Sequence, residues 1–423
     1  MIHNDAVAAE RAILVGLNAD CFRPEETATE ESLDELEALL ETAGGVCTAK
    51  VLQNRHTPDP HSFIGEGKAQ EVKELLETTE ASLVVFDNDL SASQIRALEE
   101  ITGVTVLDRS ALILDIFAQR AKTAEGRLQV ELAQYRYLLP KLSGMGKSMS
   151  RLGGGIGTRG PGESKLETDR RHIRERIDRL REELEQVRKV RGVQRERRLR
   201  NAVPVVALVG YTNAGKSTLL NRLTDAGIEA NDRLFDTLDT TTRRLKVSDH
   251  LEVLLSDTVG FIAKLPHHLI ESFKATLEEL EYADLLLHVI DVSDPQMNEH
   301  IAVVDKLIEQ LAKPGTPVLR CYNKADLAED LSGFPIGETN IPMCARSGIG
   351  MDELLTRIEE TLLGKLHKMN LLLPYAQGGV LETLHEQAQV CKVEYLSEGI
   401  SVEAICKSEL YEKFKRFEQG PPL

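Results

Sequence analysis

Short apolar runs alternate with longer amphipathic stretches along the first 115 residues of the chain. Apolar runs of this length are typical of buried strands, and apolar residues spaced three or four apart are typical of helices. Strands that alternate with helices run parallel, because each connecting helix packs its apolar face on the sheet. We therefore predict an N-terminal α/β domain, residues 1–115, with strands at 12–17, 46–52, 83–86 and 104–107 and helices at 30–42, 67–77 and 91–101.

A narrower apolar seam follows over residues 116–200. Its apolar positions recur three, four or seven residues apart in two segments, which is typical of two helices packed side by side. The pattern therefore predicts an antiparallel helical hairpin. The first segment carries Leu128, Leu132, Tyr135, Leu139 and Leu142, and the second carries Leu166, Ile173, Ile177, Leu180, Leu184 and Val187.

The loop between these two segments is rich in glycine. Residues 143–162 contain eight glycines together with Lys147, Arg151 and Arg159. Such a loop buries little surface and loses much entropy when it is ordered, so a flexible tether is one interpretation. We prefer a loop that becomes ordered on a phosphate-rich partner, because glycine lets backbone N–H groups approach closely while arginine neutralises charge.

Strand and helix patterns alternate again from residue 201 to about 364. The expected strands lie at 203–209, 244–247, 251–256, 285–289, 317–322 and 341–342, and the expected helices at 216–224, 269–281, 298–312 and 351–363. This order predicts an α/β fold with a mostly parallel, doubly wound sheet and ligands at the carboxyl ends of its strands. Residues 370–423 predict strand, helix, strand, strand and helix, which makes a small C-terminal α+β domain.

One strand-to-helix connection has the composition of a phosphate-binding loop. It fits G-x4-G-K-S and lies directly between an apolar run and a helix-like segment. The glycines let backbone N–H groups point at phosphates, the helix N-terminus adds its dipole, Lys216 supplies a positive charge and Ser217 would hold Mg²⁺. The candidate residues are Gly210, Tyr211, Thr212, Asn213, Ala214, Gly215, Lys216, Ser217 and Thr218.

Two further motifs follow in order, each at the end of an expected strand. They are Asp257-Thr258-Val259-Gly260 and Asn323-Lys324-Ala325-Asp326. The Asp326 carboxylate can accept hydrogen bonds from N1–H and the exocyclic amine of guanine, which adenine does not offer in that arrangement. Asn323 and Lys324 would brace and flank the base, and Cys344-Ala345-Arg346 would form the loop behind it. Each motif alone is common in solvated turns, but the three in this order predict a GTPase.

Composition and charge add a second feature. A chain of 423 residues with 42% hydrophobic residues can fill about three domain cores. The net charge of −17, taken whole, argues against a nucleic-acid-binding protein. Residues 140–200, however, hold 18 Lys/Arg against 9 Asp/Glu, so one basic segment lies in an acidic protein. A basic helix is often only a solvated face, and that alternative stays open.

The chain carries no sign of secretion or of a membrane span. No charged-then-apolar leader opens it, and no apolar run approaches the ~20 residues that cross a bilayer. The six cysteines show no C-x-x-C or metal-ligand spacing and lie mostly in apolar strand-like runs, so we expect reduced core residues. We expect a cytoplasmic monomer with neither a membrane nor DNA as its partner.

Several segments resemble the HflX family of translation-associated GTPases, along essentially the whole chain. They are residues 63–68 (FIGEGK), 112–121 (LILDIFAQRA), 128–134 (LQVELAQ), 154–163 (GGIGTRGPGE), 166–171 (LETDRR), 235–239 (FDTLD) and 257–261 (DTVGF). The resemblance implies a GTPase that binds the large ribosomal subunit and helps to split stalled or idle ribosomes under stress. It also implies that the basic hairpin, residues 140–200, reaches the rRNA of the peptidyl-transferase region.

The resemblance also implies roles around the nucleotide. Thr237, in the segment Phe235-Asp236-Thr237-Leu238-Asp239, would complete the Mg²⁺ shell with Ser217 when a γ-phosphate is bound. Asp257 would hold the ion through water, and the Gly260 N–H would sense the γ-phosphate. Hydrolysis would then release both loops. Asp236 and Thr240 replace the family's usual Ala and Pro, and would alter the mobility of this loop rather than abolish activity.

Two residues bear on the rate of hydrolysis. Phe261 stands where Ras-like enzymes carry a glutamine that orients the attacking water, so we expect slow intrinsic turnover with water positioned by backbone groups or by the ribosome. Asn213, in G-x-x-N-x-G-K-S, is similar to the asparagine of GTPases that use K⁺ in place of an arginine finger. The alternative is that Asn213 only caps the loop.

Three functions fit these features. The leading one is a GTPase that splits ribosomes, and the second is a GTP-dependent assembly or signalling switch that binds ribosomal particles without splitting them. The third treats residues 1–115 as an additional nucleotide-dependent RNA-remodelling domain. No second phosphate loop is found in those residues, which disfavours the third.

Overall fold

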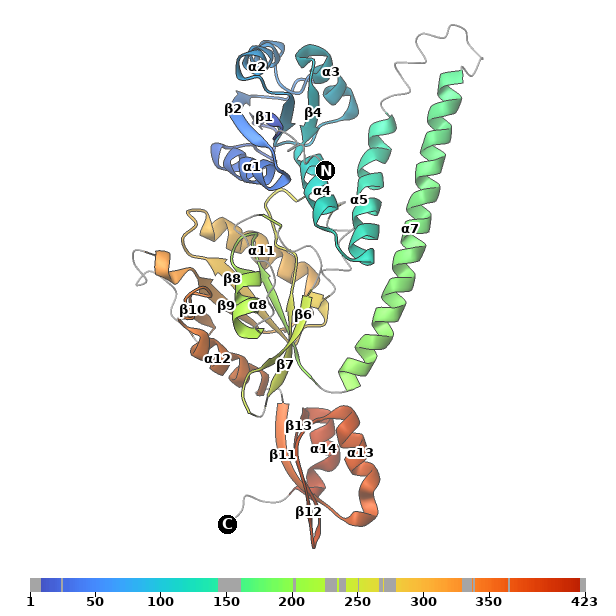
Figure 1. Ribbon diagram of the computed structural model, residues 1–423, viewed down its shortest axis with the longest axis vertical. Coiled ribbons are helices and arrows are strands. Elements are labelled where there is room, and N and C mark those ends of the chain that lie inside the picture. Colours follow the sequence, from blue (N-terminus) through green and yellow to red (C-terminus); the bar gives the residue numbers. More distant parts are fainter. Residues whose placement is uncertain are drawn as a thin grey trace, which may run out of the picture. The chain divides into compact units, whose positions relative to one another are not determined.

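The computed structural model describes residues 9–23, 26–143, 161–200, 203–224, 234–235, 241–249, 251–265, 269, 279–328, 337, 339–363 and 366–418 (Figure 1). Two compact units form. The first is Met1–Glu185 with Arg233–Leu238 and Ala263–Lys274, and the second is Gln186–Asp232, Asp239–Ile262 and Ala275–Leu423. No helix among the described residues is long and apolar enough to cross a membrane.

A four-stranded parallel sheet forms the centre of the first unit, with strand order β2-β1-β3-β4. Strand β1 is buried along nearly its whole length, as expected for a parallel sheet with helices on both faces. The prediction of a small parallel sheet is confirmed. The elements are β1 (Arg11–Ala19), α1 (Glu30–Ala43), β2 (Val46–Arg55), α2 (Glu66–Thr79), β3 (Leu83–Phe86), α3 (Ala92–Thr102), β4 (Thr105–Asp108) and α4 (Arg109–Arg120).

Local capping explains where these helices begin and end. Before α1, the Ser32 N–H donates to Thr29 Oγ1 at 3.1 Å and the Thr29 N–H donates to Ser32 Oγ at 2.8 Å. The same reciprocal pair joins Ser91 and Gln94 at α3. Helix α1 ends at Gly44, whose φ of +93° lies in the left-handed region that glycine favours.

A buried charge network lies in the first unit and includes part of the chain that follows the DTVG motif. Arg109 is 2% exposed; its Nη1 donates to Asp87 Oδ1 at 2.9 Å and its Nη2 to the carbonyl oxygen of Ala263 at 3.0 Å. The Lys264 ammonium also pairs with Asp87, and Glu35 pairs with Arg109. The residues that follow Ile262 are therefore held by charges at the carboxyl end of strand β3.

The predicted hairpin consists of α5 (Ala124–Ser143) and α7 (Pro161–Arg200), which run antiparallel (Figure 1). Their apolar seam forms a cluster of its own around Leu132, Ile177, Leu180 and Leu184. Across the seam, Arg176 Nε and Nη2 donate to Glu131 Oε1 and Oε2 at 2.8 and 3.0 Å. The helical pattern is thus confirmed, whereas residues 144–160 of the glycine-rich loop lie outside the described residues.

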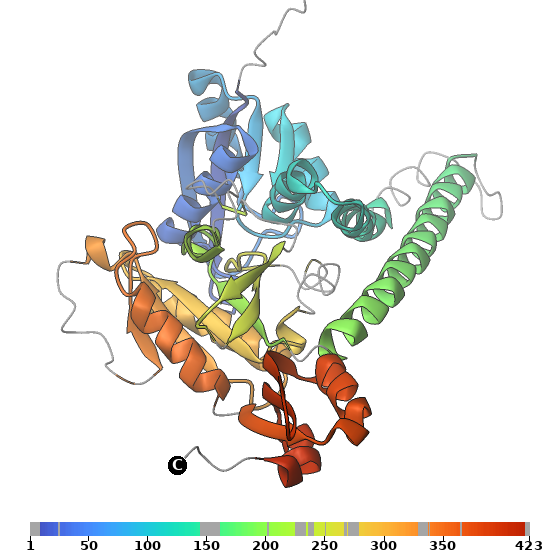
Figure 2. The ribbon, with the colours of Figure 1, turned by 60° about the horizontal axis from the view of Figure 1, so that its bottom comes forward.

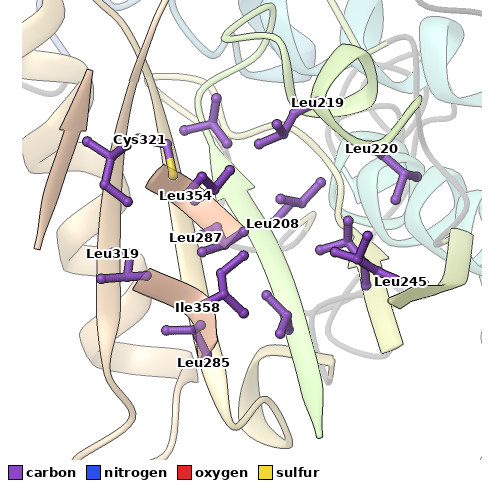
Figure 3. Close-up of a cluster of buried hydrophobic side chains, with 14 of the residues drawn as sticks. Leu208, Leu219, Leu220, Leu245, Leu285, Leu287, Leu319, Cys321, Leu354 and Ile358 are labelled. Atoms are coloured by element: carbon purple, nitrogen blue, oxygen red, sulfur yellow. The ribbon is translucent and has the colours of Figure 1, made fainter. Parts of the chain in front are cut away.

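The second unit contains a six-stranded sheet of order β10-β9-β8-β5-β7-β6, parallel except at β6. Leu219 and Leu220 of α8 and Leu354 and Ile358 of α12 pack in one core on one face of this sheet (Figure 3). The predicted doubly wound α/β fold is confirmed. The elements are β5 (Val205–Gly210), α8 (Lys216–Thr224), β6 (Thr241–Lys246), β7 (Glu252–Asp257), β8 (Leu285–Asp291), α11 (Met297–Leu311), β9 (Val318–Asn323), β10 (Asn340–Pro342) and α12 (Met351–Leu363). The expected helix 269–281 lies mostly outside the described residues.

The C-terminal elements form an antiparallel sheet of order β11-β13-β12 with two helices (red in Figure 2). The predicted order of strand, helix, strand, strand and helix is confirmed. The elements are β11 (Leu366–Leu373), α13 (Gly378–Gln387), β12 (Gln389–Leu396), β13 (Gly399–Lys407) and α14 (Ser408–Phe414). None of the six cysteines forms a disulfide; Cys321, Cys344 and Cys406 are buried as expected, but Cys21 and Cys391 are exposed.

Candidate nucleotide-binding site

The loop from Gly210 to Ser217 connects β5 to α8 at the carboxyl end of the sheet, where doubly wound folds bind ligands. Both of its glycines lie where a Cβ atom would collide with neighbouring atoms. A Cβ on Gly210 would lie 2.3 Å from the Val289 carbonyl oxygen, and one on Gly215 would lie 2.2 Å from Asn323 Nδ2. Gly215 also has a φ of +94°, which side-chain-bearing residues rarely adopt. Val289 and Asn323 therefore leave no room for a side chain at these two positions of the loop.

Lys216 lies inside the loop and is 6% exposed. Its ammonium donates to the carbonyl oxygens of Gly210 and Tyr211, at 3.1 and 2.7 Å. Burial lowers the pKa of Lys216 to about 8, although the nearby Asp257 carboxylate acts in the opposite direction. Because burial lowers the pKa of this ammonium more than the Asp257 carboxylate raises it, a bound anion such as a phosphate would stabilise its charged form.

Ser217 and Asp257 meet at the first turn of α8. The Ser217 hydroxyl donates to Asp257 Oδ2 at 2.8 Å, and Asp257 is fully buried at the end of β7. A hydroxyl and a carboxylate oxygen side by side are the donor types that Mg²⁺ prefers, so these residues fit the implied ion. Thr237, the third expected ligand, lies outside the described residues, as do Asp236, Leu238 and Asp239.

Gly260 lies against the phosphate loop. A Cβ on Gly260 would come within 2.9 Å of Thr212 Cγ2 and 3.1 Å of the Lys216 ammonium. The next residue, Phe261, joins the loop through its backbone, since its N–H donates to the Gly210 carbonyl at 3.1 Å and its carbonyl accepts from Thr212 N at 2.7 Å. The DTVG segment and the phosphate loop thus form one connected backbone surface around Lys216.

Asn323, which is expected to brace the base, contacts the phosphate loop in this structure. Its Nδ2 donates to the Ala214 carbonyl at 2.8 Å, and its Oδ1 accepts from the Ala345 N–H at 2.9 Å. One side chain therefore fixes the phosphate loop and the loop of Cys344, Ala345 and Arg346 relative to each other. Asp326 lies exposed in the short 3-10 helix Ala325–Leu327, where its carboxylate can meet a base edge.

Lys324 has a partner that sequence reasoning did not find. Its ammonium lies 2.6 Å from Asp291 Oδ2, at the carboxyl end of β8, and its φ is +61°. Asp291 therefore fixes the Lys324 ammonium at the carboxyl end of β8. The signal that was available is the place of Asp291 directly after the apolar run 285–290. Phe235, by contrast, is described in the first unit, where its ring packs edge-on against Phe117 at 4.8 Å between centroids.

Comparisons with known proteins show the family of the chain. Family models described as GTP-binding GTPase N-terminal, GTP-binding GTPase Middle Region and 50S ribosome-binding GTPase match residues 30–118, 120–198 and 205–324. A GTPase HflX of Caldanaerobacter subterraneus subsp. tengcongensis is 49% identical over 409 residues, which cover 96% of this chain and 94% of that protein. A GTPase HflX of Escherichia coli K12 is 44% identical over 398 residues, 93% of each chain.

The chain belongs to the HflX family. As an HflX-family protein with a GTPase domain it is a GTP hydrolase. Among solved structures, the SsGBP complex with GDP is similar, with 24% identity and a TM-score of 0.49 over 84% of this chain and 99% of that one.

In this HflX-family GTPase, Phe261→Gln should not create a faster enzyme. Phe261 is 2% exposed, so a glutamine there would lie in the interior instead of meeting the attacking water. Burying its amide in place of a ring should lower the free energy of unfolding by about 2–4 kcal/mol. Turnover of GTP and thermal unfolding measure the two effects, with Phe261→Leu as the apolar control. A tenfold or greater gain in turnover would contradict the buried placement.

Proposed function

We propose that this HflX-family GTPase binds the large ribosomal subunit and uses GTP to split stalled or idle ribosomes under stress. The proposal rests on the presence of two features in the same chain: a candidate guanine-nucleotide site, and a helical hairpin that contains a basic segment. The description of the family model that matches residues 205–324, a 50S ribosome-binding GTPase, supports the choice of partner.

The charge along α7 indicates where rRNA would bind. Residues 167–189 carry 8 Lys/Arg against 7 Asp/Glu, whereas residues 190–200 carry 5 against 1. Concentrated positive charge attracts phosphates more strongly than positive charge interspersed with acids. We therefore propose that rRNA contacts involve the glycine-rich loop and residues 190–200 rather than the middle of the hairpin.

The nucleotide would be held by the residues around Lys216. Bound Mg²⁺, held by Ser217, Thr237 and, through water, Asp257, would neutralise phosphate oxygens during transfer. Lys216 would bind the β- and γ-phosphates, and the Gly260 N–H, adjacent to Lys216, would donate to the γ-phosphate. Loss of the γ-phosphate would remove the Gly260 contact and release the segment that follows it.

Asn213 would serve hydrolysis as a ligand of K⁺. Its φ of +60° places it in a left-handed turn, its side chain is exposed, and it makes no hydrogen bond among the residues that the structure describes. An asparagine that only capped the loop would show such a bond. This geometry favours an amide oxygen available to a cation next to the phosphates.

Turnover should therefore be faster in KCl than in NaCl. We expect at least a tenfold difference, since a cation at this place would do part of the work of an arginine finger, which is worth about 10³–10⁵ in rate. The Asn213→Ala variant should lose the difference, while Asn370→Ala, an exposed asparagine in β11, should keep it. Equal turnover of the unaltered protein in the two salts would exclude the K⁺ role.

Light scattering of intact ribosomes tests the splitting activity. With a non-hydrolysable GTP analogue the protein should lower the scattering intensity, because each ribosome becomes two smaller particles, and with GDP the intensity should stay constant. A protein that cosediments with ribosomal particles in the analogue but leaves scattering unchanged would instead be the assembly or signalling switch.

A further inference from the structure

A small cavity lies behind the phosphate loop, between β8 and α11. It is lined by Tyr211, Thr212, His288, Asp291, Asp294 and His300, all of the second compact unit. The GTPase site described above uses the loop residues and Asp291 but gives no task to His300, which is on the first turns of α11.

His300 is stacked on the phosphate loop. Its ring lies 3.6 Å from the Tyr211 ring between centroids, with 10° between the planes. Its Nδ1 lies 3.4 Å from Asp294 Oδ2, and Asp294 is itself fixed because its Oδ1 accepts from the Gln296 N–H at 2.8 Å. The start of α11 thus holds the imidazole flat against Tyr211, which is only 7% exposed.

Tyr211 connects several parts of the catalytic site through its backbone. Its carbonyl accepts from the Lys216 ammonium at 2.7 Å and from the Ala214 N–H at 3.3 Å. Its backbone also forms a parallel bridge with Phe261, directly after Gly260. A shift of Tyr211 would therefore move the carbonyl that accepts from Lys216 and the segment after β7 that carries Gly260.

We propose that His300 is a positioning residue for GTP binding and hydrolysis. Its ring clamps Tyr211, and the Tyr211 carbonyl then holds Lys216 where the β- and γ-phosphates bind. Small misplacements of a catalytic group cost large factors in rate, so a clamp of this kind acts on turnover as well as on affinity. The proposal rests on the GTPase activity alone, and no ribosome is needed to test it.

Three single variants test the clamp with the full-length chain. His300→Ala should lower kcat for GTP roughly tenfold and weaken GDP binding several-fold, because Lys216 loses its fixed support. His300→Phe keeps a flat ring and should restore both values to within about twofold of the unaltered protein. His385→Ala, an exposed histidine of α13, is the matched control and should change neither value.

A double-mutant cycle with Tyr211→Leu separates positioning from general stability. If His300 acts through Tyr211, the double variant should lose no more kcat than Tyr211→Leu alone; additive losses would overturn the proposal. A folded His300→Ala protein whose kcat and GDP affinity stay within twofold of the unaltered protein would also overturn it, as would a folded Phe variant without rescue. If the Ala variant does not fold, the cycle is run with His300→Gln.

Discussion

The Asp326→Asn variant should bind GTP about 10³–10⁴-fold more weakly and should bind XTP instead. Asp326 would accept hydrogen bonds from the N1–H and the exocyclic amine of guanine, and an amide that replaces it would present an N–H to that amine. Xanthine carries a carbonyl oxygen at this position, so the amide can donate to it. A site built for hydrogen bonds rejects a mismatched partner strongly because polar groups that the bound base covers are left unpaired.

Fluorescent, non-hydrolysable GTP and XTP analogues measure this exchange of preference directly. The control is Asp249→Asn, an exposed acid of the turn after β6 that pairs with Lys246, and it should leave both affinities unchanged. If Asp326→Asn keeps its affinity for GTP and gains none for XTP, the base binds elsewhere, and residues 323–326 are not the guanine-binding motif.

Loss of the Lys216 ammonium should have the second large effect. Lys216→Ala removes a buried positive charge. The ammonium is held in the phosphate loop by hydrogen bonds to two carbonyl oxygens. Interactions of this kind, preorganised where charge develops, are worth about 10²–10³ in kcat each, so turnover should fall by at least that factor. Steady-state phosphate release measures it.

The matched control removes a lysine that lies far from the loop in sequence. Lys313→Ala, after α11, takes away an exposed ammonium and should leave turnover within twofold of the unaltered protein. The nucleotide-free Lys216→Ala protein should be at least as stable to thermal unfolding as the unaltered protein, because burial of the ammonium opposes folding. A Lys216→Ala protein that hydrolyses GTP normally would contradict the site.

Much of the fold follows from local patterns. Strand β3 and helix α12 coincide with the predicted ranges: β3 is buried at all four positions, as a continuous apolar run indicates, and the buried positions of α12 recur every four residues. The predicted range 244–247 begins three residues after the observed start of strand β6 at Thr241. This strand is an antiparallel edge strand that begins with polar Thr241 and Thr242, so its apolar signal is weak.

Some residues of the nucleotide site could be predicted from the sequence, and others could not. Gly215, Lys216 and Asn323 are in motifs whose spacing alone indicates a nucleotide site, and the structure brings these three residues together. Asp291 and His300 are in no motif. Their tasks arise only because the sheet brings the ends of β8 and β9 together and places α11 against the phosphate loop, which a linear pattern does not encode.

Cosedimentation with large ribosomal subunits tests most directly whether the nucleotide decides engagement of rRNA. The protein should pellet with the subunits when it is loaded with a non-hydrolysable GTP analogue and should remain in the supernatant when it is loaded with GDP. Replacement of residues 153–162 by a neutral linker of equal length should abolish pelleting while GTP affinity is kept. Equal pelleting of the GDP-loaded and analogue-loaded forms would contradict the account.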